Sequence, residues 1–212
     1  MSWFSRGSRK EKESAGKTAT LQVENEPEVH RSLALPFLFE AMRKGDKRMV
    51  LDLGTAIGSN VERLSEYGSK LFIEDLYASR ASAGEGETLG PDFFEQLVSP
   101  PEGTGFDIVL AWDLFNYLQR KELALLAAQI RRHCRPGALV FALIWIHKTI
   151  PAQPIRFRFQ DQDKLVYERR TALERPGPRF APAELNSSFQ GFRVDRSFLL
   201  RHGIQEYLFI RE

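Results

Sequence analysis

The sequence is poor in several features that would place it in a specialised class of protein. Its one cysteine, Cys134, excludes an internal disulfide framework and a cysteine-based zinc site. The longest apolar run, residues 138–146, has the length of a strand and is far shorter than the roughly 18 residues of a membrane-spanning helix. His, Asp and Glu nowhere cluster at the spacing of metal ligands. We therefore predict no metal site and no transmembrane segment.

The sequence also lacks an excess of positive or negative charge, because its formal net charge is only +2 in 212 residues. This balance favours neither nucleic acid nor an acidic substrate as a partner. Residues 1–17 hold five basic and two acidic side chains, so the basicity belongs to the N-terminus. Its composition predicts a disordered basic tail over residues 1–24, ahead of a single domain over residues 25–212.

The tail raises two alternatives. Trp3 and Phe4 stand beside basic residues, which would suit a weak contact with a membrane surface. The alternative, which we favour, is an ordinary solvated tail. The tail lacks an apolar stretch long enough for a signal peptide, and the chain lacks disulfides, so we expect a reducing, cytoplasmic location.

What the sequence does contain is an alternation of helical and strand patterns. Apolar spacing predicts helix over 26–44 with a break near Pro36, and further helices over 59–68 and 120–134. Nearly continuous apolar runs predict buried strands over 48–54, 70–75, 106–112 and 138–147. This order predicts a parallel sheet with helices on both faces. Antiparallel hairpins are expected over 192–212 and, as an insertion, over 155–170.

The stretch VLDLGTAIGSN, residues 50–60, carries the strongest functional signal. Asp52 ends a strand, Gly54 opens the turn and Gly58 starts a helix. Glycine lets the backbone approach a ligand closely, because it has no side chain. A carboxylate at Asp52 would repel a pyrophosphate but would pair with an ammonium group. The turn therefore favours a zwitterionic or nucleoside ligand over a dinucleotide.

This turn resembles motif I of the class I S-adenosylmethionine-dependent methyltransferases, whose pattern is acid-x-Gly-x-Gly-x-Gly. Asp52, Gly54 and Gly58 match the pattern, whereas Ala56 stands where the family has its middle glycine. The stretches YGSKLFIEDL, GFDIVLAWDLFNYL and CRPGALVFALIW resemble the second, fourth and fifth strands of the family, and the closing hairpin resembles the sixth and seventh.

The resemblance implies an α/β Rossmann-like methyltransferase fold, with a mostly parallel sheet and a C-terminal antiparallel hairpin. It also implies S-adenosylmethionine as cofactor, bound by Asp52, Gly54, Ala56 and Gly58. Asp75, 23 positions after Asp52, would hold the ribose hydroxyls, and Trp112 would flank the cofactor.

One part of the family pattern is missing. Residues 76–105 are rich in Gly, Ser and Pro, and their one apolar cluster, over 93–98, has helical spacing. The family's third strand is therefore expected to be very short, around residues 88–89, or absent. Without it, the adenine side of the pocket would be built from this loop or from a protein partner.

Candidate catalytic residues follow the fourth and fifth predicted strands. Asp113 and Asn116 could position or deprotonate an acceptor, although capping of the next helix is an equal alternative. His147 could act as a base, or it could be a strand-end histidine bonded to solvent or backbone. The Asn/Asp-Pro-Pro-aromatic motif of amino-methylating nucleic-acid enzymes does not occur. A small-molecule acceptor is therefore expected.

The sequence leaves three functions open. The first is a methyltransferase that acts on a small molecule. The second is a methyltransferase-fold protein that does not catalyse and instead binds a partner; Ala56 and the missing third strand support it. The third, a dinucleotide-dependent oxidoreductase, is disfavoured by Asp52 and by the closing hairpin.

Overall fold

The computed structural model describes residues 26–44, 47–84 and 88–212. The basic tail predicted over residues 1–24, and with it the membrane-surface contact, lies outside the described residues. Within them, no helix combines the length and the apolar character that crossing a bilayer requires.

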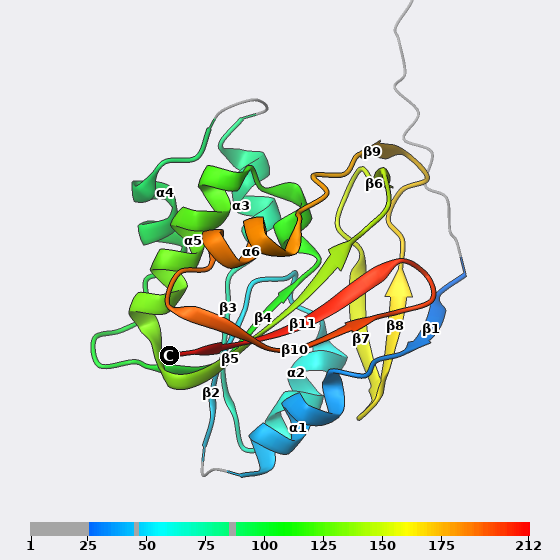
Figure 1. Ribbon diagram of the computed structural model, residues 1–212. Coiled ribbons are helices and arrows are strands. Elements are labelled where there is room, and N and C mark those ends of the chain that lie inside the picture. The colour runs from blue at the N-terminus through cyan, green and yellow to red at the C-terminus, as the bar shows by residue number, and fades with distance from the viewer. Residues whose placement is uncertain (1–25, 45–46, 85–87) are drawn as a thin grey trace, which may run out of the picture.

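A six-stranded sheet forms the centre of the molecule (Figure 1). Its strands follow one another across the sheet in the order β10 (Phe192–Leu199), β11 (Ile204–Arg211), β5 (Cys134–Trp145), β4 (Phe106–Trp112), β2 (Met49–Asp52) and β3 (Lys70–Ile73). The last four are mutually parallel, whereas β11 pairs antiparallel with both β5 and β10. The predicted methyltransferase fold, with its C-terminal hairpin, is confirmed.

The sheet ends at β3, and the described part of residues 76–105 contains no strand that extends it. Helix α4 (Pro91–Leu97) lies in this segment instead, as the spacing of its apolar residues predicted. The third strand of the family is therefore absent from the described chain.

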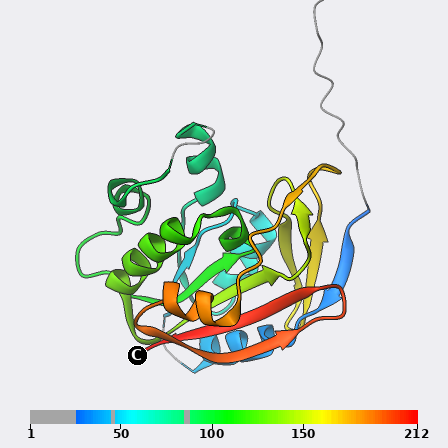
Figure 2. The ribbon, with the colours of Figure 1, turned by 45° about the horizontal axis from the view of Figure 1, so that its top comes forward.

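Helices cover both faces of the sheet (Figures 1 and 2). The first face carries α3 (Leu76–Ser82), α4, α5 (Arg120–His133) and α6 (Pro182–Ser188), and the second carries α1 (Leu35–Arg43) and α2 (Gly58–Ser65). Successive residues of a strand point to opposite faces. On β5, Val140 and Ala142 accordingly belong to the first core, while Phe141 and Leu143 belong to the second.

A separate three-stranded sheet lies over the second face. The inserted hairpin forms its strands β7 (Arg156–Asp161) and β8 (Lys164–Glu168), as predicted, and β1 (Glu28–Arg31) pairs with β8. The helix predicted to start near residue 26 is therefore wrong over β1, because pairing with β8 overrides the local pattern. Pro36 does not break a helix; it lies in the first turn of α1, where the missing N–H is tolerated. A short pair, β6 (Thr149–Pro151) and β9 (Glu174–Pro176), completes the insertion.

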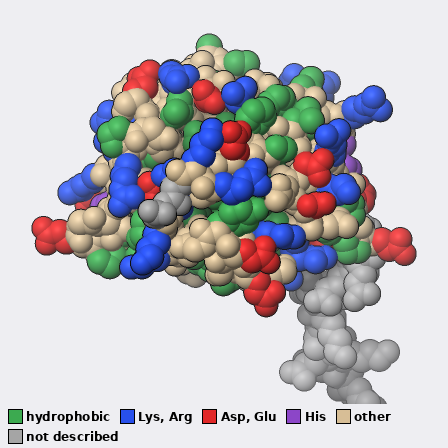
Figure 3. Space-filling view, turned by 90° about the horizontal axis from the view of Figure 1, so that it is seen from below, with side chains coloured by type: hydrophobic (Ala, Val, Ile, Leu, Met, Phe, Trp, Pro, Cys, Tyr) green, Lys and Arg blue, Asp and Glu red, His purple; other side chains and the backbone are tan. Residues whose placement is uncertain are grey.

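Acidic and basic side chains are interspersed over the face of the molecule that Figure 3 shows. This face therefore carries mixed charge rather than a patch of one sign.

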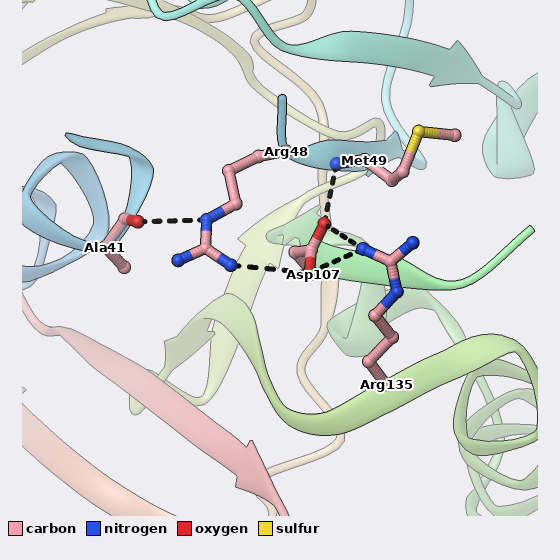
Figure 4. Close-up of polar contacts among 5 residues, drawn as sticks. All are labelled: Ala41, Arg48, Met49, Asp107 and Arg135. Atoms are coloured by element: carbon pink, nitrogen blue, oxygen red, sulfur yellow. Dashed lines mark hydrogen bonds and ion pairs between the residues drawn. The ribbon is translucent and has the colours of Figure 1, made fainter. Parts of the chain in front are cut away.

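At the amino ends of the parallel strands, Asp107 joins three strands and a helix (Figure 4). Its carboxylate accepts a hydrogen bond from the Met49 backbone N–H at 2.8 Å and two from Arg135, both at 3.0 Å. Arg48 contacts the same carboxylate at 3.4 Å and donates to the carbonyl of Ala41. This cluster lies far along the strands from the glycine-containing turn and is structural.

We expect Asp107→Ala to lower the free energy of unfolding by about 1–3 kcal/mol, because a poorly exposed backbone N–H and two arginines lose their acceptor. Urea unfolding measures the change. Glu66→Ala is the control, since its ion pair with Arg63 is exposed and should contribute well under about 1 kcal/mol. Equal losses in the two variants would contradict the structural role of Asp107.

Candidate functional site

The turn between β2 and α2 has the form that the sequence predicts. Asp52 is the last residue of β2, and its Oδ1 accepts the backbone N–H of Gly54 at 2.9 Å. Ala56 is exposed and does not have a positive φ, so its methyl group is accommodated without strain. Gly58 begins α2 and has open space around the position of a Cβ. The turn is intact despite the loss of its middle glycine.

Asp75 reaches the same turn from the end of β3. One carboxylate oxygen accepts the hydroxyl of Thr55 at 2.7 Å, and the other caps α3 by accepting the N–H of Ala78 at 2.9 Å. The charge of Asp75 also contributes to the raised pKa of Asp52, which shows that the two acids lie near each other. The structure therefore brings both predicted acids to the turn, but Asp75 already has donors from the protein on both oxygens.

Trp112 fills the space in front of Gly54. Its indole N–H donates to Oδ1 of Asp52 at 2.7 Å. A Cβ on Gly54 would lie 2.7 Å from Cδ1 of the indole, so the lack of a side chain at Gly54 admits this ring. Trp112 was predicted to flank the cofactor. The structure places Trp112 at the turn, with its N–H on the carboxylate that was expected to pair with a ligand's ammonium group, and the role toward a cofactor stays a prediction.

The backbone of Trp112 is unusual as well. It has φ +49°, in the left-handed region that costs a residue with a side chain roughly 1–2 kcal/mol. The register of β4 against β5 shifts between Leu110 and Trp112. The end of β4 is thus bent in a way that directs the indole toward the turn.

The inserted hairpin holds the indole in place. Phe157 stacks on Trp112 with ring centroids 5.7 Å apart and planes 4° apart, and Phe159 lies against it at 5.3 Å. Asn60 of α2 binds β7 at two points, donating to the carbonyl of Phe157 at 2.8 Å and accepting from the N–H of Phe159 at 2.9 Å. Asn60 is 2% exposed, so both bonds are buried.

The space left at the turn is therefore very small. Gly54, Asp75, Trp112 and Phe157 line a cavity of about 30 Å³. Such a volume holds one or two water molecules. In this arrangement the residues do not fit S-adenosylmethionine, because the volume is too small for it. Groups of the protein also bond Oδ1 of Asp52 and both carboxylate oxygens of Asp75.

Burial raises the pKa of Asp52 to about 6, and the hydrogen bonds from Trp112 and Gly54 counteract part of this rise. Burial likewise raises the pKa of Asp113 to about 7. Asp113 follows Trp112 and is fully buried; its Oδ2 accepts the N–H of Ile155 at 3.2 Å, with the indole N–H of Trp145 at 3.5 Å. Its side chain does not cap the following 3-10 helix η1 (Leu114–Tyr117).

The other two predicted catalytic residues lie apart from the turn. Asn116 is 1% exposed and uses its amide to bind the carbonyls of Asp113 and Leu143 and the N–H of Trp145. It thereby anchors η1 to β5. His147 is exposed beyond the end of β5, and its Nε2 lies 3.2 Å from the carbonyl of His202. Neither side chain faces the cavity at Gly54.

A larger cavity, of about 570 Å³, lies beside His147. His30 and His202, each half-buried, both line it. The sequence carried no signal for this pairing, because His30 lies on β1, whose strand character was missed, and His202 lies in the turn between β10 and β11.

Comparison with known proteins supports the fold. No protein-family model and no curated protein matches the sequence. The PH0226 protein of Pyrococcus horikoshii is similar in structure, with 16% identity, a TM-score of 0.50, and coverage of 84% of this chain and 88% of that protein. This similarity shows a shared fold.

Two methyltransferase structures are similar at slightly lower scores. An S-adenosylmethionine-dependent methyltransferase from Methanosarcina mazei has 13% identity and a TM-score of 0.48, covering 84% of this chain and 97% of its own. The glycopeptide N-methyltransferase MtfA, complexed with S-adenosylhomocysteine, has the same identity and score, with 84% and 88% covered. The methyltransferase fold of this chain rests on its own sheet order, with β11 antiparallel between β5 and β10.

The raised pKa of Asp113 predicts a pH-dependent stability. Between pH 3.8, the ordinary pKa, and about 7, the folded state binds a proton that the unfolded state has lost. The free energy of unfolding therefore falls as the pH rises through this window, by at most about 1.4 kcal/mol per pH unit for this group.

Asp113→Asn should remove this contribution, so the difference in unfolding free energy between variant and wild type should change across the window and level off above it. Urea unfolding at several pH values measures the difference. Asp52 titrates in both proteins and cancels. Parallel pH curves for the two proteins would show that Asp113 does not titrate in this way.

Proposed function

We propose that this chain uses the methyltransferase fold as a binding scaffold and does not transfer methyl groups from the glycine-containing turn. The contact that supports this proposal is the one between Trp112 and the turn. The indole N–H donates to Oδ1 of Asp52, which also accepts the N–H of Gly54, and the ring lies against Gly54. A group of the protein thus makes the contacts that a charged nucleoside would need.

The strength of the closure supports the same conclusion. Phe157 and Phe159 belong to the core that also contains Leu38, Phe39 and Val50, so the hairpin is part of the folded interior. Exposing Phe157 and Phe159 would cost about 1.5–3 kcal/mol for each side chain. Losing the two Asn60 hydrogen bonds would cost about 1 kcal/mol for each bond, so opening the hairpin would cost at least about 5 kcal/mol. An opening cost of about 5.5 kcal/mol would weaken the affinity for any ligand at the turn about 10⁴-fold.

A second candidate function is methyl transfer from S-adenosylmethionine to a small molecule. The observation in its favour is that Asp52, Gly54 and Asp75 lie at the positions used by the family, and that the closing residue, Trp112, has a strained backbone. Methyl transfer would require Trp112 to leave the turn. Asp113 is then the nearest of the candidate catalytic residues, since Asn116 and His147 are directed elsewhere.

The scaffold proposal also includes a partner. The described loop around α4, which stands in place of the third strand, is one region where a protein could bind.

A single buried cysteine, whose pKa is raised by burial to about 12, fits a reducing compartment such as the cytoplasm.

Calorimetric titration with S-adenosylmethionine and S-adenosylhomocysteine separates the two functions. We expect the wild-type protein to show no saturable binding at millimolar ligand. Trp112→Ala, which removes the closing ring, should show saturable binding of S-adenosylhomocysteine with a Kd of about 100 μM or lower. Adding Asp75→Ala to this variant should abolish the gain.

Trp145→Ala is the matched control, because Trp145 lines the larger cavity and not the turn. It should leave nucleoside binding unchanged, and thermal unfolding verifies that each variant is folded. Micromolar binding by the wild-type protein, lost in Asp75→Ala, would refute the closed turn and support the methyltransferase instead.

A further inference from the structure

The larger cavity lies between the end of β5, the turn between β10 and β11, and the outer sheet of β1 and β8. Its volume of about 570 Å³ lies within the range of roughly 300–1,000 Å³ that is typical of small-molecule sites. Of its lining residues, Ile155 is the one that also lines the small cavity at Gly54. The two cavities are therefore neighbours separated by packed side chains.

Aromatic rings form much of the wall. His30 and His202 lie with ring centroids 4.0 Å apart, and Tyr167 lies 4.5 Å from His30 and 5.3 Å from His202. Trp145 and His147 form a second pair at 6.1 Å. Such rings offer flat apolar surfaces that favour stacked or edge-to-face contact with another ring.

Several polar atoms of the wall have no hydrogen-bond partner among the described residues. They are the hydroxyl of Tyr167, Nε2 of His202 and Nε of Arg169. Buried polar groups are normally bonded, and these three atoms are almost inaccessible to water in this conformation. Burial raises the pKa of Tyr167, and the nearby charges of Glu206 and Asp113 add to the rise, so its hydroxyl lies toward these two acids. Arg169 can only donate, and the Tyr167 hydroxyl can donate as well.

Some charged side chains of the wall form ion pairs, and others do not. Glu28 is bonded to His30 at 3.0 Å, and Glu174 contacts Arg169 loosely, at 3.7 Å, through Nη2. Glu26 and Lys148 lie exposed at the rim with opposite charges. Burial lowers the pKa of His202 to about 4, with His30 and His147 adding to the effect and Glu28 opposing it, so His202 is neutral at pH 7.

We propose that this cavity binds a flat aromatic or heteroaromatic small molecule that carries a carboxylate. The ring system packs against Tyr167, His202 and Trp145, and the carboxylate accepts hydrogen bonds from the partly exposed guanidinium of Arg169. An arginine provides two donors in a plane that matches a carboxylate. This site goes beyond the scaffold function and does not depend on whether the turn at Gly54 admits a nucleoside.

Three probes with the same ring test the proposal: 2-naphthoate, 2-naphthamide and 2-naphthylmethylamine, which are anionic, neutral and cationic at pH 7. We expect calorimetry to show saturable binding of 2-naphthoate, with the amide about tenfold weaker and the amine weaker still. Tightest binding of the amine, equal binding of all three, or no binding at millimolar concentration would each overturn the proposal.

Variants identify the contacts. Arg169→Gln should weaken 2-naphthoate about tenfold while leaving 2-naphthamide unchanged. Arg170→Gln is the matched control, because Arg170 is exposed and lines the other cavity. Equal losses in Arg169→Gln and Arg170→Gln, with both variants as stable as wild type in thermal unfolding, would show that general charge, and not this site, governs binding.

Discussion

The hydrogen bond between the indole N–H of Trp112 and the carboxylate of Asp52 determines how the rest of this structure is to be understood. It joins the ends of two neighbouring parallel strands at the point where open α/β sheets bind their ligands. Burial would make an uncompensated carboxylate costly there, and the indole supplies the missing donor. Because the ring must approach Gly54, the glycine that normally admits a cofactor here admits a side chain.

The inserted hairpin turns this local contact into a property of the whole fold. Asn60 binds β7 as an adjacent strand would, and Phe157 and Phe159 complete the core on the second face of the sheet. The space that the family devotes to a cofactor thus becomes hydrophobic interior. Ligand-sized volume appears instead on the far side of Ile155, where β1 and the turn at His202 close a second cavity. The larger of these two cavities therefore lies away from the glycine-containing turn.

The sheet and the turn could be predicted well from the sequence, because both depend on local patterns. Apolar runs ending in Asp52 and Trp112 indicated the strands, and the spacing from Asp52 to Asp75 placed both acids at one turn. The prediction was wrong for β1, whose residues have no strand pattern and are extended only because β8 offers hydrogen bonds. For the same reason nothing in the sequence indicates that His30 and His202, which are 172 positions apart, lie with ring centroids 4.0 Å apart.

The sequence by itself determined the fold, since periodicity, glycine positions and the acids at strand ends act over a few residues each. It also determined that the turn could be formed with Ala56, whose side chain faces solvent. Only the tertiary structure decided what fills the turn, because the direction of the Trp112 ring depends on a bent strand end and on a hairpin about 45 residues further along the chain. Packing between such distant segments leaves no periodic trace in the sequence, and here that packing decides which cavity remains open.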